Sequence, residues 1–142
     1  MREILFRGKA KAIAGCPYNN GKSDGEWVFG YIFPDLGAMK IRQFEPDRPE
    51  CNDYEIDPET VGQYTGLTDK NGTKIFEGDI LTIENEGVYA AIKYNESNAA
   101  FYVEDEDHED YLGEAWETDV IIIGNIHDNP ELLQKILTRP KE

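Results

Sequence analysis

Short apolar runs separated by turn-forming residues recur along this chain, and they predict a protein built mainly of β-strands. Each run is rich in aromatic and β-branched residues and is bounded by Gly, Pro, Asn or Asp, as strands between tight turns are. Strands are expected at 3–7, 26–33, 38–44, 80–83, 88–94 and 99–103. The second and third runs predict a hairpin, and the last three predict a meander.

The stretch from Asp119 to Ile126 differs from these runs because its four residues from Val120 to Ile123 are all apolar. A strand buried on both faces has this continuous pattern, so we predict a strand in the middle of a sheet. After it, Asn129 can cap a helix, Pro130 suits the first helical position, and leucine and isoleucine recur on one stripe until Pro140. One helix is therefore expected near residue 130.

The segment 63–75 contains the strongest local turn signal, the dipeptide Asn71-Gly72 between two runs able to pair as strands. Asn-Gly suits the left-handed backbone of a two-residue type I′ turn, so a hairpin is predicted here. The alternating oxygen donors that start at Asp69 also look superficially like a calcium loop. That interpretation fails because Gly72 is fourth and Ile80 twelfth, where an EF-hand needs glycine sixth and glutamate twelfth.

Many short strands, tight turns and one helix predict a mainly β (α+β) fold, either a small SH3-like barrel or a strongly bent antiparallel sheet with a short C-terminal helix. We divide the chain into an N-terminal strand and β-hairpin region, 1–56, and a barrel-like core with the helix, 57–142; the two could also form one continuous domain. Between the hairpin and the core, Pro46 and Pro49 are expected to break the chain before Asp57 caps one short turn.

Two motifs then carry a family likeness. Residues 61–80 read VGQYTGLTDKNGTKIFEGDI and residues 124–133 read GNIHDNPELL. In these segments the chain resembles the YopX family of phage and prophage proteins. The resemblance implies a phage or prophage gene product of mainly β architecture that self-associates and has no known chemistry. It assigns no catalytic, cofactor-binding or metal-binding residue.

The motif residues themselves suit turns and a helix start better than chemistry. Glycine is needed where turns or bulges demand an unusual backbone conformation, and an Asn-Pro pair can begin a helix. We therefore expect fold-determining roles for Gly66, Asn71, Gly72, Gly78, Asp79, Gly124, Asn129 and Pro130.

Charge is distributed unevenly along the chain. The net charge is −15; residues 1–50 hold 8 basic and 7 acidic side chains, which leaves 6 basic and 22 acidic ones for the rest. Such a surface repels phosphate, so direct nucleic-acid binding is disfavoured. Aromatic residues such as Trp27, Tyr31 and Phe33 are better explained as core or as subunit contacts than as base-stacking groups. An unidentified protein partner and a homo-oligomer are expected.

One acidic run is the candidate interaction surface. It packs six carboxylates and one histidine into seven residues. Such a run could hold a divalent cation or imitate a phosphate chain toward a basic partner, but blocks of like charge are more often solvated hairpin tips. The surface consists of Glu104, Asp105, Glu106, Asp107, His108, Glu109 and Asp110.

The cysteines and histidines do not indicate a metal or catalytic site. Cys16, Cys51, His108 and His127 all stand alone, whereas structural zinc sites draw their ligands in close pairs. No nucleophile-elbow motif is present either. No cofactor, catalytic residue or metal ligand is assigned, and an enzyme is disfavoured.

The function expected from the sequence is a phage or prophage accessory protein that works by protein–protein contact and self-associates. Two alternatives remain open: an acidic nucleic-acid mimic that occupies a basic DNA- or RNA-binding protein, and a metal-dependent hydrolase using clustered carboxylates. With no apolar run of the roughly 20 residues that a membrane helix needs, we expect no membrane association and a location in the cytoplasm of the bacterial host.

Overall fold

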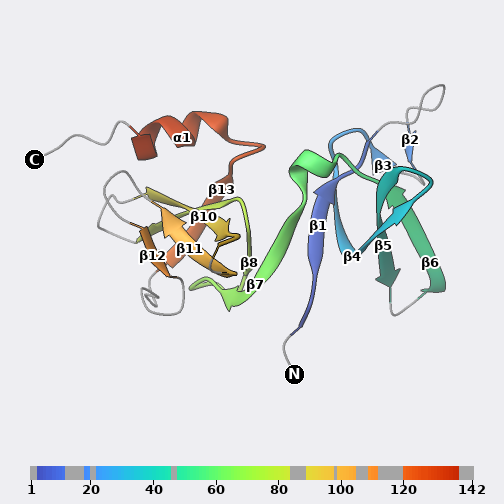
Figure 1. Cartoon of the computed structure of the whole chain (residues 1–142), viewed down its shortest axis with the longest axis horizontal. Coiled ribbons are helices and arrows are strands. Elements are labelled where there is room, and N and C mark those ends of the chain that lie inside the picture. The colour runs from blue at the N-terminus through green and yellow to red at the C-terminus, as the bar shows by residue number, and fades with distance from the viewer. Residues whose placement is uncertain are drawn as a thin grey trace, which may run out of the picture. The chain divides into compact units, whose positions relative to one another are not determined.

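The computed structural model of this chain divides into two compact units, residues 1–64 and 65–142 (Figure 1). The structure describes residues 3–11, 18–19, 22–45, 48–83, 89–97, 99–104, 109–111 and 120–137. Both units consist mostly of antiparallel strands, and the second carries a helix, so the predicted mainly β class is confirmed.

The first unit contains six strands, a single-turn 3₁₀-helix and the start of a seventh strand. Their bounds are β1 Phe6–Lys9, β2 Tyr18–Asn19, β3 Lys22–Ser23, β4 Trp27–Asp35, β5 Ala38–Glu45, β6 Arg48–Glu55, η1 Pro58–Thr60 and β7 Gly62–Thr68. Hydrogen-bonded neighbours follow the order β6-β5-β4-β1-β7, while β2 and β3 form a separate small ribbon. The predicted hairpin is β4 and β5, and Asp57 caps η1 as expected by accepting a bond from Glu59 N.

The core of the first unit lies on one face of this sheet. Alternate residues of β4, β5 and β6 point inward, and Val28, Ile41 and Tyr54 are buried together with Ala10 and Ile56. A bridge between Ala10 and Ile56 joins the end of β1 to the residue that follows β6, so the sheet bends back toward its own edge. It is a strongly bent sheet, the second of the two predicted forms.

Strand β6 was not predicted, because the prolines were expected to break the chain there. Pro46 lies outside the described residues, but Pro49 lies within β6. Proline is tolerated in a strand that ends a sheet, since its missing N–H can face away from the ladder, and β6 is the terminal strand of this order. The first strand also lies later than predicted, at Phe6–Lys9 instead of 3–7.

The second unit continues β7 into β8, Lys74–Phe76, and adds a five-stranded sheet and one helix. Its other elements are β9 Asp79–Ile83, β10 Tyr89–Asn95, β11 Ala100–Glu104, β12 Glu109–Tyr111, β13 Val120–Asn125 and α1 Pro130–Leu137. The strand order is β12-β11-β10-β9-β13, so β9, β10 and β11 form the predicted meander. Among the described strands, β12 and β13 are the two ends of an open sheet, and the predicted SH3-like barrel is not closed.

Both faces of this sheet are covered in its central part, as β9 demonstrates. Its Leu81 packs with Ile75, Ile92 and Val120 on one face. The neighbouring Ile80 points the other way and packs with Ala91, against which Leu132 and Leu133 of α1 lie. The helix therefore docks by the apolar stripe that its sequence predicts.

The prediction that the stretch from Asp119 to Ile126 forms a central strand is wrong, because β13 ends the order of the described strands. Its apolar residues differ in burial. Val120 is buried and Ile122 is half-buried in the same cluster, whereas Ile123 is 36% exposed. The register shifts between Ile122 and Gly124, which interrupts the alternation of sides. A continuous apolar run thus reflects an irregular edge strand here.

A two-residue type I′ turn joins β4 and β5, at Leu36-Gly37. These residues have φ values of 50° and 81°, and Asp35 pairs directly with Ala38. Both central residues of a type I′ turn need positive φ, which leucine adopts only with strain. Leu36 gains nothing from packing, since it is fully exposed.

Leu36→Asn is therefore expected to stabilise the protein by roughly 0.5–1 kcal/mol, because asparagine tolerates the left-handed conformation better than leucine. Urea denaturation followed by circular dichroism measures the change in the free energy of unfolding. Leu36→Ala is the control: it removes the same exposed surface without the asparagine preference and should give no comparable gain. An equal gain from both variants would refute the turn argument.

Candidate functional site

The central motif of the sequence forms the β7–β8 hairpin, but not with the predicted type I′ turn. Asp69 N donates to Thr73 O over 2.9 Å, and Gly72 N donates to Asp69 O over 3.0 Å. Gly72 has φ of 82°, while Asn71 is not among the residues with positive φ. The connection is thus a three-residue loop, Lys70 to Gly72, with glycine at its left-handed position.

The carboxylate of Asp69 holds this loop together. Its Oδ1 accepts hydrogen bonds from the backbone amides of Asn71 and Thr73, both over 2.9 Å. Its Oδ2 accepts one from the amide of Ile122 in β13, over 3.2 Å. The side chain is 8% exposed, so these amides replace the water that a carboxylate otherwise binds. Sequence reasoning considered Asp69 only as a calcium ligand and missed this role.

The loop also covers the outer edge of the five-stranded sheet. Besides the Asp69 contact, Lys70 N donates to Val120 O over 2.8 Å. These bonds occupy backbone groups of β13 that would otherwise be open to pairing with another chain. The central motif therefore closes an edge of the second unit.

Two further glycines of the motif lie where the backbone is left-handed. Gly66 has φ of 94° within β7, and the hydroxyl of its neighbour Thr65 donates to Ile75 O. Gly78, with φ of 93°, donates to Ile92 O and accepts from Ile126 N. Beside it, the buried Asp79 accepts a 2.7 Å hydrogen bond from Phe76 N. These contacts tie β7 to β8, and the β8–β9 turn to β10 and to the residue after β13.

The closing motif, residues 124–133, contains a second cluster of hydrogen bonds, which lies just before the helix. Asn125 is 9% exposed, and its Oδ1 accepts from the amides of His127 and Asp128. Asn129 Oδ1 accepts from Asn125 N over 3.2 Å, so this side chain reaches back to β13 instead of capping the amides of α1. Pro130 is the first residue of the helix. A Cβ at Gly124 would overlap Asn129 Oδ1, so a larger residue there would displace this side chain from its bond to Asn125 N.

The acidic candidate surface is described only in part. Glu104 ends β11 and accepts 3.3 Å contacts from Lys93 Nζ and Tyr102 Oη. The backbones of Glu109 and Asp110, in β12, pair with β11. Asp105, Glu106, Asp107 and His108 lie outside the described residues. Any role of these seven residues stays a prediction.

The described residues bring no three His, Cys, Asp or Glu side chains together in a group that could hold a metal ion. Cys16 and His108 fall outside the residues that this statement covers, and for Cys51 only the backbone is described. Within the same part of the chain, no helix is long and apolar enough to cross a membrane.

A different surface emerges from the pairing of strands in the first unit. Aromatic residues occupy alternate positions of β4 on the side away from the core: Trp27, Phe29, Tyr31 and Phe33. Phe29 is 42% exposed and Tyr31 is 60% exposed. We call these four side chains the aromatic row. The alternation in the sequence EWVFGYIF could have revealed it, since the intervening Val28 and Gly30 are buried.

Each member of the aromatic row has a cation directly opposite on a neighbouring strand. On β1, Lys9 pairs with Trp27 and Arg7 with Phe29. On β5, basic residues likewise stand opposite Tyr31 and Phe33, in the pairs Tyr31–Arg42 and Phe33–Lys40. The guanidinium carbon of Arg7 lies 4.6 Å from the centre of the Trp27 ring, and that of Arg42 lies 5.0 Å from the Phe33 ring. These are cation–π distances.

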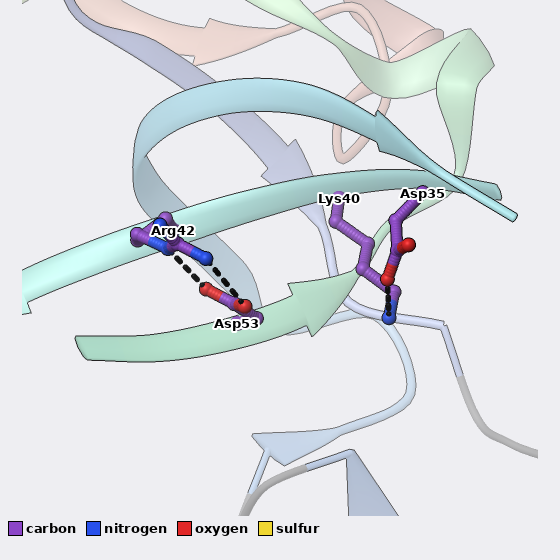
Figure 2. Close-up of polar contacts among 4 residues, drawn as sticks. All are labelled: Asp35, Lys40, Arg42 and Asp53. Atoms are coloured by element: carbon purple, nitrogen blue, oxygen red, sulfur yellow. Dashed lines mark hydrogen bonds and ion pairs between the residues drawn. The ribbon is translucent and has the colours of Figure 1, made fainter.

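The cations on β5 are also paired with carboxylates (Figure 2). Arg42 binds Asp53 of β6 through two hydrogen bonds of 2.8 and 3.1 Å, and Lys40 Nζ lies 2.9 Å from Asp35 Oδ2. The Arg42 hydrogen bonds lower the pKa of Asp53, and the hydrogen bond to Asp35 raises the pKa of Lys40. The sheet face beside the aromatic row is thus close to neutral.

Both sequence motifs lie within a region that matches a known protein family. The YopX protein family matches residues 34–134, more than half of the chain. The chain belongs to the YopX family. The match runs from the end of β4 into α1 and includes both motifs, which agrees with the resemblance seen in the sequence.

The crystal structure of protein EF1440 from Enterococcus faecalis is similar in fold to this YopX-family chain. The two are 24% identical, with a TM-score of 0.57, over 94% of this chain and 99% of that one. At this identity the likeness concerns the fold alone. No curated protein matches the chain in sequence.

Asp69→Asn is expected to destabilise the protein by roughly 1–3 kcal/mol, because an amide nitrogen would replace a carboxylate oxygen that faces backbone N–H groups. Urea denaturation measures the change in the free energy of unfolding. Glu96→Gln makes the same charge change at an exposed turn residue and should have little effect. Equal effects of the two substitutions would contradict the role of Asp69.

The ion pair of Asp53 predicts a pH dependence. Its pKa is lower in the folded than in the unfolded chain, so its contribution to stability is present at neutral pH and is lost as the pH falls through the folded-state value. Asp53→Asn should therefore cost at most about 1 kcal/mol at pH 7, the usual limit for an exposed pair.

That difference between wild type and Asp53→Asn should shrink as the pH drops below the ordinary carboxyl value of about 3.9. Thermal melts at several pH values provide the measurement. Glu59→Gln on η1, an exposed carboxylate, serves as the control. A difference that stays constant with pH would rule out the ion pair as its cause.

Proposed function

We propose that this YopX-family chain is a phage- or prophage-encoded accessory protein that acts by protein–protein contact, without catalysis of its own, and that self-associates. The observation that carries this proposal is the aromatic row on the outer face of β4. Large aromatic side chains and arginine are the residues that protein interfaces favour, particularly at their centres.

The use of polar residues in the two motifs supports the same function. Backbone amides of the same turns donate hydrogen bonds to the side-chain oxygens of Asp69, Asn125 and Asn129. A side-chain oxygen that binds backbone amides in this way stabilises the fold and is not available to bind a substrate. The most recognisable parts of the sequence are therefore explained by folding, and the surface offered to a partner lies elsewhere.

The two alternatives from the sequence, an acidic mimic of nucleic acid and a hydrolase with clustered carboxylates, both depend on the run from Glu104 to Asp110. Glu104 makes its described contacts with Lys93 and Tyr102 of the same sheet. This arrangement fits a hairpin end as well as it fits a binding surface. It favours neither alternative, and both stay predictions.

Self-association is tested by light scattering coupled to size-exclusion chromatography over a hundredfold range of protein concentration. We expect a mass of at least two chains that falls on dilution. Pull-down from bacterial lysate at low and high salt tests for a further protein partner. A strict monomer that retains no partner at either salt concentration would overturn the proposal.

A further inference from the structure

The aromatic row presents an extended apolar contact surface in the first unit. Its four rings stand on alternate residues of one strand, so the row is about 20 Å long. Exposure is greatest at its middle, where Phe29 and Tyr31 are 42% and 60% exposed. Single exposed apolar residues are ordinary, but a continuous row with its most exposed members at the centre is typical of a contact site.

The charges around the row decide what kind of partner fits. The charged side chains that the structure describes on this face of β1, β4, β5 and β6 nearly balance: they are Lys9, Lys40, Arg42 and the buried Arg7 against Asp35, Asp53 and Glu55. Two of the cations are already bound to carboxylates of the same face. A phosphate chain would compete with those carboxylates and be repelled by them, so single-stranded nucleic acid fits poorly.

The rest of the molecule makes the same face suitable for a second copy. Each chain carries a net charge of −15, so two copies repel each other over most of their surfaces. The repulsion is weak where cations offset carboxylates, as they do on the face around the aromatic row. Contact there also removes exposed aromatic surface from water.

We propose that the outer face of β4 and β5 is where two copies of this chain meet, with the aromatic row at the centre of a two-fold interface. An axis that runs along the strands between β4 and β5 sets Tyr31 and Phe33 of each copy on Arg42 and Lys40 of the other. It thereby repeats between copies the cation–π contact that Arg42 makes with Phe33 within one copy. This assignment rests on the proposed self-association and names its surface.

The test compares variants by light scattering and by sedimentation velocity. The double variant Phe29→Thr/Tyr31→Thr removes the two most exposed rings of the aromatic row. The β-branched threonines that replace them preserve the propensity of β4 to form a strand. We expect the dissociation constant to rise at least about tenfold, because aromatic anchors at an interface centre carry much of the affinity. Ile123→Thr, an equally polar change at an exposed strand position in the second unit, should leave it unchanged.

A measurement on the unaltered protein guards against misfolding of the double variant. Hydrogen–deuterium exchange at concentrations above and below the dissociation midpoint should show added protection in β4 and β5 at high concentration, and none in α1. Weaker self-association of the double variant, together with this protection in the unaltered protein, supports the proposed interface.

Three outcomes overturn the inference. If the wild type oligomerises but the double variant associates equally well, the interface lies elsewhere and the proposed self-association still stands. If protection appears only outside β4 and β5, the same conclusion holds. A wild type that stays monomeric at all concentrations removes the proposed self-association and this surface with it.

Discussion

The second unit depends on one buried carboxylate that takes the place of water for three backbone amides. Asp69 binds two of these amides within its own loop and the third in β13. The first two bonds fix the shape of the hairpin, and the third fixes where that hairpin lies along the edge of the sheet. The loop in turn places Lys70 against Val120, which packs with Leu81 and Ile92 in the core. One side chain therefore links local turn geometry to the burial of apolar surface.

Much of the fold could be predicted from the sequence because its strands and its helix are locally encoded. The β4–β5 hairpin, the meander and α1 all follow from alternation, turn residues and an apolar stripe. The turn types could not be predicted equally well. Asn71-Gly72, the better match to a type I′ turn, forms a longer loop because Asp69 offers competing bonds, while Leu36-Gly37 adopts the type I′ form despite leucine.

Position within a sheet was the least predictable property, since it depends on contacts far apart in sequence. Pro49 suggested a break, yet a terminal strand accommodates it. The run from Val120 to Ile123 suggested a central strand, yet a loop from another part of the chain covers its open edge. Among functional candidates, the aromatic row was visible as alternation, but its pairing with cations required the register of three strands.

The contact between Gly124 and Asn129 bears on how sequences of this family can change. A methyl group at position 124 would meet the Asn129 side chain, which is itself bonded to the backbone of the neighbouring Asn125. A larger residue at position 124 therefore requires the Asn129 side chain to move or to be replaced, whereas glycine at position 124 leaves room for other residues at 129. Among relatives, a chain with a larger residue at the first position is expected to lack asparagine at the second. Divergence of the closing motif is thus ordered, because position 129 changes before position 124 or together with it.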